Sequence, residues 1–416
     1  MPFSSLGLSP ALLRAASLRG YLVPTPIQVA TIPAVLQGRD VLGSAQTGSG
    51  KTAAFVLPLL QQLQSGPHEK PRRVRVLVLV PTRELTAQVG EEIRSLSQHL
   101  PHAPKVAVVF GGVSINPQMM NLRGGADIVV ATPGRLLDLA DHNAVRLSSV
   151  SSLVLDEADR LFDLGFSEEL GRILALLPAQ RQNLFFSATF PPAVQALAQT
   201  LLVDPVRIEV LSEPEQAPDI TQRAIAVDAG RRTQLLRHLI EQQGWRRVLV
   251  FVATKHAAEM VADKLRKARI YAEPFHGELS QGKRTQVLAD FKASRLKVVV
   301  ATDVAARGID IAQLPVVVNY DLPRSAVDYI HRIGRTGRAG ESGLALSLVS
   351  TDTLAHWHLI QKRQRLELPL EEVAGFEPLQ ATTAAGDMPA PLSTGGIKGK
   401  RPSKKDKLRA AANREA

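Results

Sequence analysis

Short, wholly apolar runs recur along the first half of the 416-residue chain, separated by longer amphipathic stretches. Strands buried on both faces of a parallel sheet have this composition, and the stretches between them are long enough for crossover helices. The pattern therefore predicts an α/β architecture built from βαβ units. The predicted strands are 76–80, 106–110, 128–131, 153–155 and 184–186.

A second series of the same kind begins after residue 220, with amphipathic stretches such as 256–268 between its apolar runs. Between the two series, residues 211–219 contain two prolines and several acidic side chains, a composition typical of a linker. The pattern predicts two tandem parallel-sheet domains, 31–210 and 220–376. The predicted strands of the second are 225–227, 248–252, 298–301, 316–319 and 344–348.

Composition agrees with two soluble domains. A chain of this length exceeds what one hydrophobic core usually supports, and 45% hydrophobic with 21% charged residues is typical of a globular protein. The absence of cysteine excludes disulfides and thiolate chemistry. With no apolar run long enough to span a membrane and no basic-then-apolar start, we expect a cytoplasmic protein without membrane contact.

Positive charge is unevenly distributed, with an excess at the C-terminal end of the chain. Of the formal charge of +11, residues 398–416 carry +6, which leaves about +5 for the rest. After residue 376 the chain turns to Ala, Thr, Gly and Pro and then to Lys and Arg, so residues 377–416 are predicted to be a disordered basic tail. Such a tail suits either RNA contact or simple solvation, and the sequence does not decide between them.

A glycine-rich segment follows the apolar Val41 and Leu42 and precedes a helical pattern. This strand, loop and helix order is what a phosphate-binding loop requires, because backbone N–H groups and the helix dipole then face the phosphates. Lys51 is expected to reach the β- and γ-phosphates, and Thr52 to hold Mg²⁺. The segment is Ala45, Gln46, Thr47, Gly48, Ser49, Gly50, Lys51 and Thr52.

Acidic residues follow the predicted strand 153–155. In this architecture a carboxylate at the carboxyl end of a strand lies beside the phosphate loop, where Asp156 is expected to hold the metal and Glu157 to orient or deprotonate water. Phosphoryl transfer also needs positive charge on its transition state. Arg335 and Arg338, three residues apart in the second domain, are the candidates for arginine fingers.

Taken in order, these motifs resemble the DEAD-box ATP-dependent RNA helicases, most closely the bacterial RhlE subgroup, over about nine tenths of the chain. The resemblance implies two RecA-like domains preceded by an adenine-recognition segment, 1–30. The further motifs that carry it are Gly20-Tyr21, Pro24–Gln28, Pro81–Leu85, Gly111-Gly112, Thr132–Leu136, Ser187–Thr189, Val250–Thr254, Ala301–Asp310 and His331–Arg338.

The resemblance also implies roles for individual residues. Gln28 and Phe3 would contact adenine, and Asp310 the ribose. Ser187, Ala188 and Thr189, with Asp159 and His331, would couple hydrolysis to strand separation. The residues implied to hold RNA phosphates and sugars without reading bases are Pro81, Thr82, Arg83, Gly112, Thr132, Pro133, Gly134, Arg135, Thr302 and Arg307.

The predicted function is an RNA-dependent ATPase that uses ATP and Mg²⁺ to unwind short RNA duplexes, acting as a monomer. Ribosomal precursors and RNA-degradation machinery are the candidate partners. An RNA clamp or scaffold without productive unwinding remains an alternative, and so does a DNA helicase, because phosphate contacts are common to both polymers. A metabolic P-loop kinase leaves the second domain and its arginines unexplained. Trp357 is interpreted as a packing residue rather than a base-stacking platform.

Overall fold

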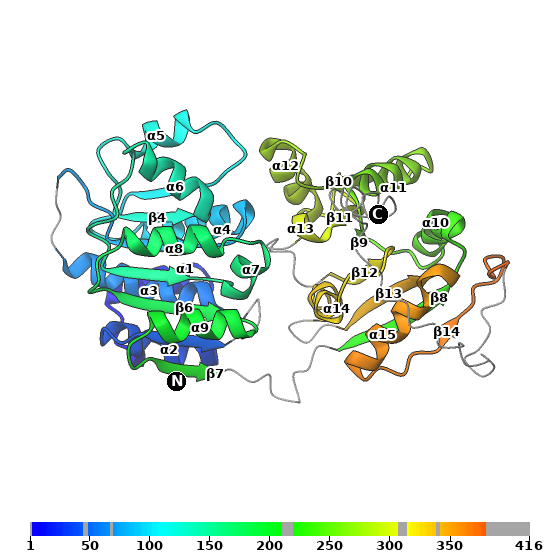
Figure 1. Cartoon of the computed structure of the whole chain (residues 1–416), viewed down its shortest axis with the longest axis horizontal. Helices are drawn as coiled ribbons and strands as arrows, with labels where there is room; N and C mark the ends of the chain where they lie inside the picture. The colour runs from blue at the N-terminus through cyan, green and yellow to red at the C-terminus, as the bar shows by residue number, and fades with distance from the viewer. Residues whose placement is uncertain are drawn as a thin grey trace, which may run out of the picture. The chain divides into compact units, whose positions relative to one another are not determined.

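The computed structural model describes residues 2–44, 49–66, 70–209, 219–306, 314–337 and 342–379. Within these ranges the chain forms two sheets of seven strands each, and every strand pair in both sheets is parallel (Figure 1). The predicted α/β architecture is confirmed. Among the described helices, none has the length and apolar composition needed to cross a lipid bilayer.

The first sheet has the order β3-β4-β2-β5-β6-β1-β7. Its strands are β1 Val41–Ser44, β2 Val76–Leu79, β3 Val106–Val109, β4 Ile128–Ala131, β5 Ser152–Leu155, β6 Gln182–Ser187 and β7 Val206–Glu209. The helices are η1 Phe3–Leu6, α1 Pro10–Leu18, α2 Pro26–Leu36, α3 Lys51–Ser65, α4 Arg83–Ser97, α5 Asn116–Leu122, α6 Pro133–Asp141, α7 Ala158–Asp163, α8 Ser167–Ala175 and α9 Pro192–Leu201.

Alternate residues of each strand in the first sheet enter two different cores, as the period of two in a strand requires. Val76 and Val78 pack with α1 to α4 on one face, whereas Leu77 and Leu79 pack with α6, α8 and α9 on the other. Helices on both faces explain why these strands are apolar throughout rather than alternating in polarity.

The second sheet has the order β10-β11-β9-β12-β13-β8-β14. Its strands are β8 Ile220–Ala226, β9 Val248–Val252, β10 Ala272–Phe275, β11 Val298–Thr302, β12 Val316–Asn319, β13 Gly343–Val349 and β14 Leu370–Glu371. The helices are η3 Ala229–Arg231, α10 Arg232–Gln242, α11 Lys255–Lys267, α12 Gln281–Lys292, α13 Asp303–Ala306, α14 Ala326–Ile333, η4 Thr351–Thr353 and α15 Leu354–Gln364.

The second sheet is also covered on both faces, by α10 and α11 on one and by α12 to α15 on the other. Trp357 of α15 is fully buried, and its ring meets that of Tyr329 of α14 edge to face at 5.8 Å. The interpretation of Trp357 as a packing residue is confirmed. Residues 211–218 of the predicted linker and 380–416 of the predicted tail lie outside the described residues.

Candidate nucleotide and RNA site

The predicted chemistry of the first domain gathers at the carboxyl ends of its strands, because parallel strands all end at the same edge of a sheet. The phosphate loop follows β1, the segment 81–83 follows β2, and Asp156 directly follows β5. Thr132 follows β4, and Ser187 is the last residue of β6. Segments far apart in the sequence are thereby brought to one edge of one sheet.

The first turn of α2 holds the phosphate loop. Gly50, at a φ of +90°, is the N-cap residue of α3, and the side-chain amide of Gln28 donates to the Gly50 carbonyl oxygen at 3.2 Å. A side chain at Gly50 would lie 2.6 Å from Nε2 of Gln28 and 3.0 Å from Oγ1 of Thr25. Glycine is therefore required here, and Gln28 contacts the loop directly as well as being the expected adenine contact.

Polar groups in the described part of the loop suit a phosphate ligand. Lys51 is buried at the start of α3, and the buried Oγ of Ser49 has no hydrogen-bond partner in the structure. A buried hydroxyl left unpaired is costly unless a ligand or water satisfies it. Thr52 is half-buried on the next helical position, while Ala45, Gln46, Thr47 and Gly48 lie outside the described residues.

Two carboxylates are buried where β5 ends. Burial raises the pKa of Asp156 to about 6, and the nearby Lys51 ammonium opposes the shift. Glu157 has a φ of +52°, in the left-handed region that glycine favours, and its Oε2 pairs with Nη1 of Arg160 at 2.7 Å. Arg160 has no predicted role; its signal in the sequence is its spacing of three residues from Glu157 on a helix.

The oxygen donors of Asp156 and Thr52 suit Mg²⁺, and they are too few for a metal whose ligands all come from the protein. Asp156 and Thr52 offer a carboxylate and a hydroxyl oxygen, the hard ligands that Mg²⁺ prefers, and Mg²⁺ takes most of its remaining ligands from water and substrate phosphates. In the described ranges, no three His, Asp or Glu side chains gather into a metal site of their own. The residues thus suit a metal that arrives with the nucleotide.

Asp159 links the acidic segment to the end of β6. Its Oδ2 accepts hydrogen bonds from the Thr189 backbone N–H at 3.0 Å and from the Thr189 hydroxyl at 2.7 Å. The Ser187 hydroxyl accepts from the Asp159 backbone N–H at 3.1 Å and donates to the Thr189 carbonyl oxygen at 2.7 Å. Three hydrogen bonds thus join the two segments. Ala188 is exposed beside this network.

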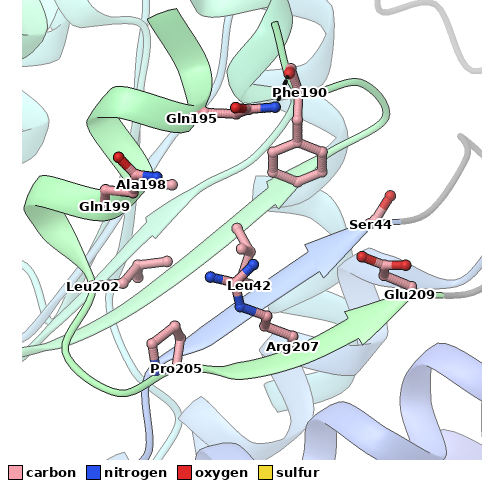
Figure 2. Close-up of a pocket in the computed structure, with 10 residues that line it drawn as sticks. All are labelled: Leu42, Ser44, Phe190, Gln195, Ala198, Gln199, Leu202, Pro205, Arg207 and Glu209. Atoms are coloured by element: carbon pink, nitrogen blue, oxygen red, sulfur yellow. Dashed lines mark hydrogen bonds between the residues drawn. The ribbon is translucent and has the colours of Figure 1, made fainter. Parts of the chain in front are cut away.

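A cavity of about 470 Å³ lies next to the end of β6, between α9 and strands β1 and β7 (Figure 2). Phe190, whose carbonyl oxygen accepts from the Gln195 amide at 2.8 Å, lines it together with Leu42 and Leu202. Arg207 and Glu209 of β7 contribute its charged side chains. None of these lining residues has a predicted role, but Ser44 directly precedes the phosphate loop and Phe190 directly follows Thr189 in the sequence.

The expected RNA-binding segments of the first domain also contact one another. A side chain at Gly112 would collide with the Arg83 guanidinium, so the segments after β2 and β3 touch. Thr82 caps α4 by accepting from the Leu85 N–H at 3.3 Å. Arg135 is buried and donates to the Val113 carbonyl oxygen at 2.7 Å. Pro81, Thr132 and Pro133 are buried as well, and Gly134 is half-buried.

In the second domain, the described polar cluster is centred on Arg332. Its guanidinium donates to both carboxylate oxygens of Asp303, at 2.6 and 2.7 Å, and to Oδ1 of Asn319 at 3.0 Å. It also lies 4.9 Å from the ring centre of Phe251. The sequence pattern did not assign roles to Asp303 or Arg332, which fix α14 to the ends of β11 and β12.

Three predicted residues of the second domain surround this cluster in the sequence. Thr302 is half-buried at the end of β11, His331 is half-buried on α14, and Arg335 is buried just beyond it. The three other predicted residues, Arg307, Asp310 and Arg338, lie outside the described residues. At the opposite end of the chain, Phe3 is buried in η1.

Residues 25–197 match the DEAD/DEAH box helicase family, and residues 231–340 match the helicase conserved C-terminal domain. Both matches fall on the two parallel sheets, and the first includes the phosphate loop, the acidic segment and the Asp159 network. The chain therefore belongs to the DEAD-box helicase family, and the predicted pair of RecA-like domains is confirmed.

Relatives and solved structures agree with this assignment. The chain is 41% identical over 348 residues to the DEAD-box ATP-dependent RNA helicase CshA of Bacillus cereus, an alignment that covers 84% of this chain and 65% of that relative. It is 41% identical over 383 residues to the ATP-dependent rRNA helicase rrp3 of Sclerotinia sclerotiorum, covering 90% and 78%. S. cerevisiae Dbp5 bound to RNA and ADP BeF3 is similar in structure, with a TM-score of 0.78 and 30% identity over 89% of this chain and 95% of that one.

The chain spans slightly less than two thirds of the length of the CshA proteins of Bacillus cereus and Bacillus thuringiensis. The RhlE subgroup stays a prediction, because these relatives bear the names CshA and rrp3.

Proposed function

We propose that the chain is an RNA-dependent ATPase that uses ATP hydrolysis to separate short RNA duplexes or to remodel RNA and its complexes. The observation that carries the proposal is the pairing of Asp159 with Thr189. It joins the segment with the buried carboxylates Asp156 and Glu157 to the segment that ends β6, so a change at the nucleotide has a path to the neighbouring surface.

Each residue of the nucleotide site has a proposed role in ATP binding or hydrolysis. Lys51 binds the β- and γ-phosphates, and Gln28 recognises adenine while holding the loop at Gly50. Glu157 orients the attacking water and takes its proton. Asp156 and Thr52 would hold Mg²⁺, which when bound neutralises charge on the phosphates.

The second domain completes the catalytic set in this proposal. Arg335 and Arg338 stabilise the negative charge that develops on the γ-phosphate, and they do so when ATP and RNA favour a closed arrangement of the two domains. Asp310 contacts the ribose and Thr302 the RNA backbone. The RNA is held by its phosphates and sugars, so binding is independent of base sequence.

The names of relatives support finer proposals. The rRNA helicase rrp3 and the RNA-bound Dbp5 favour RNA over DNA, and the first favours ribosomal precursors as the substrate. RNA-degradation machinery is the other partner proposed from the sequence. We propose that the protein acts in the cytoplasm and as a monomer.

The proposal is tested by measuring ATP turnover with single-stranded RNA, with matched DNA and without nucleic acid, alongside separation of a short RNA duplex. Glu157→Gln keeps the shape of the side chain and should lower RNA-stimulated turnover about 100-fold or more while ATP still binds. Glu168→Gln, at an exposed position of α8, is the matched control.

Three outcomes separate the alternatives. Turnover that RNA does not stimulate would refute the proposal, and equal stimulation by DNA would refute the preference for RNA. Robust RNA-stimulated turnover without strand separation would favour the clamp, in which ATP hydrolysis serves only to time release.

A further inference from the structure

Three segments that precede neighbouring strands meet at the amino-terminal edge of the first sheet. They are residues 70–75 before β2, 98–105 before β3 and 123–127 before β4, and the three strands are adjacent in the order β3-β4-β2. A cleft of about 250 Å³ opens between them, lined by residues that include Lys70, Arg72, Arg75, His102 and Asp127. This basic cleft is at the opposite edge of the sheet from the phosphate loop.

The segments that form the basic cleft are rich in Lys and Arg. The three segments around it hold six Lys or Arg and a single acidic residue, a net charge of +5, which equals that of the whole chain before residue 398. Three of the six, Lys70, Arg72 and Arg75, line the cleft itself. Glu69, the preceding residue in the sequence, lies outside the described residues and would lower the local charge by one. The remainder of that part of the chain therefore has a net charge close to zero.

The one carboxylate of the basic cleft does not neutralise it. Asp127 pairs with Arg72, and its Oδ2 also accepts from the Lys105 backbone N–H at 2.7 Å. Other cationic side chains donate to neutral carbonyl oxygens: Nζ of Lys105 to Arg123 at 2.9 Å, and Nη2 of Arg75 to Leu63 at 3.4 Å. Such bonds hold the side chains in place and leave their charge available to an anion.

The walls of the cleft are closely packed. The Arg72 backbone N–H donates to the Gly124 carbonyl oxygen at 3.3 Å, and Gly125 has a φ of +78°. A side chain at Gly125 would collide with the carbonyl oxygen of Arg72. This position requires glycine for both reasons, and the close approach sets Arg72 beside Asp127.

We propose that the basic cleft binds backbone phosphates of RNA that extends beyond the strand held at the carboxyl edge of the sheet. The inference rests on the proposed function, because it assumes that RNA is the substrate. Arginine forks and lysines bind phosphodiesters without reading bases, which suits a sequence-independent enzyme. β3 is an edge strand of the first sheet and has four residues, which span about 13 Å at the usual rise per residue. RNA that passes along this edge therefore has a short path from the carboxyl ends of the strands to the basic cleft.

The test compares two lengths of RNA. The variant Lys70→Gln/Arg75→Gln removes two charges that line the cleft and leaves the Arg72–Asp127 pair intact. Lys362→Gln/Arg363→Gln, on the exposed face of α15, is the charge-matched control. Affinity is measured by fluorescence anisotropy with single strands of about 6 and about 24 nucleotides over a series of salt concentrations.

We expect the cleft variant to bind the longer RNA about tenfold more weakly near 0.1 M salt and to lower the salt slope by about 1.4, since each phosphate contact on a single strand contributes about 0.7. Affinity for the short RNA and turnover at saturating short RNA should match those of the parent. Lys70→Arg/Arg75→Lys keeps both charges and should retain affinity for the longer RNA, which distinguishes charge from folding.

Unchanged affinity and slope with the longer RNA would overturn the inference, as would an equal loss with both lengths. Thermal stabilisation by inorganic pyrophosphate that is smaller for the variant than for the parent, without any dependence of affinity on RNA length, would reassign the cleft to small phosphates. Failure of the proposed function is distinguishable, because RNA would then not stimulate turnover of the parent protein at all.

Discussion

At the scale of single residues, the carboxylates of the nucleotide site are held in an unusual local conformation. Glu157 adopts a left-handed backbone, which costs a residue with a side chain of the order of 1 kcal/mol or more. Its carboxylate is buried against Arg160, and breaking a buried pair of this kind from one side leaves an uncompensated charge. Arg160 is therefore a positioning residue for Glu157.

The arginine-finger assignment gives a prediction for Arg335. Arg335→Ala should lower RNA-stimulated kcat about 1,000-fold while ATP binding is retained, because the lost charge acts on the transition state. Turnover and nucleotide binding, measured separately, check this. Arg237→Ala, which removes an exposed arginine of α10, is the control. Undiminished turnover in a folded Arg335 variant would remove the finger assignment.

At the scale of elements, different helices pack on the two faces of each sheet and form separate hydrophobic cores. In the second domain, Tyr329 of α14 and Trp357 of α15 form one seam with the sheet. The Tyr329 hydroxyl donates to Oε1 of Gln222 at 2.8 Å, which ties α14 to β8. Removing the Trp357 ring from such a core typically costs about 3–5 kcal/mol, so this seam contributes much of the local stability.

The same seam predicts a dependence of stability on pH. Burial raises the pKa of Tyr329 to about 12, whereas an unfolded tyrosine titrates near 10. Since the folded state favours the neutral phenol, this stabilisation is complete below about pH 10 and is lost as the pH rises to about 12, by about 2–3 kcal/mol.

Chemical unfolding of the wild type and Tyr329→Phe at several alkaline pH values measures this effect. The variant should be about 1 kcal/mol less stable near pH 8, for the lost hydrogen bond, and its disadvantage should disappear or reverse by about pH 12. Tyr271→Phe, at a side chain that is 75% exposed, controls for loss of a phenol in general. Parallel curves for wild type and Tyr329→Phe would contradict the prediction.

At the scale of the whole molecule, the segments of the basic cleft and residues 398–416 carry net charges of +5 and +6. We predict that deleting residues 398–416 weakens RNA binding and flattens its salt dependence, because fewer counterions are released when fewer phosphates are neutralised. Affinity measured over a salt series checks this. A variant with the eight Lys and Arg of this segment changed to Gln keeps its length and should behave like the deletion. A salt slope equal to that of the intact chain would mean that the segment only aids solvation.

The sequence by itself predicted the fold class, because a strand buried on both faces must be apolar at every position. It placed strands 128–131, 248–252 and 316–319 at their observed bounds. It did not predict β7 or β10, which lie at the edges of their sheets. In β7, Arg207 and Glu209 are exposed, and in β10, Glu273 and Pro274 interrupt the apolar run. An edge strand tolerates such residues because it needs neither two buried faces nor every backbone donor.

The motifs of the site were equally local, so their identities and order could be read from the chain. Only the tertiary structure decided which of them touch. The Asp159–Thr189 pair joins residues 30 apart, and Gln28 reaches Gly50 across 22. The basic cleft is assembled from three segments that each precede a different strand, and no local pattern reveals it. Periodicity and spacing are properties of neighbouring residues, whereas a shared strand edge is a property of the folded sheet.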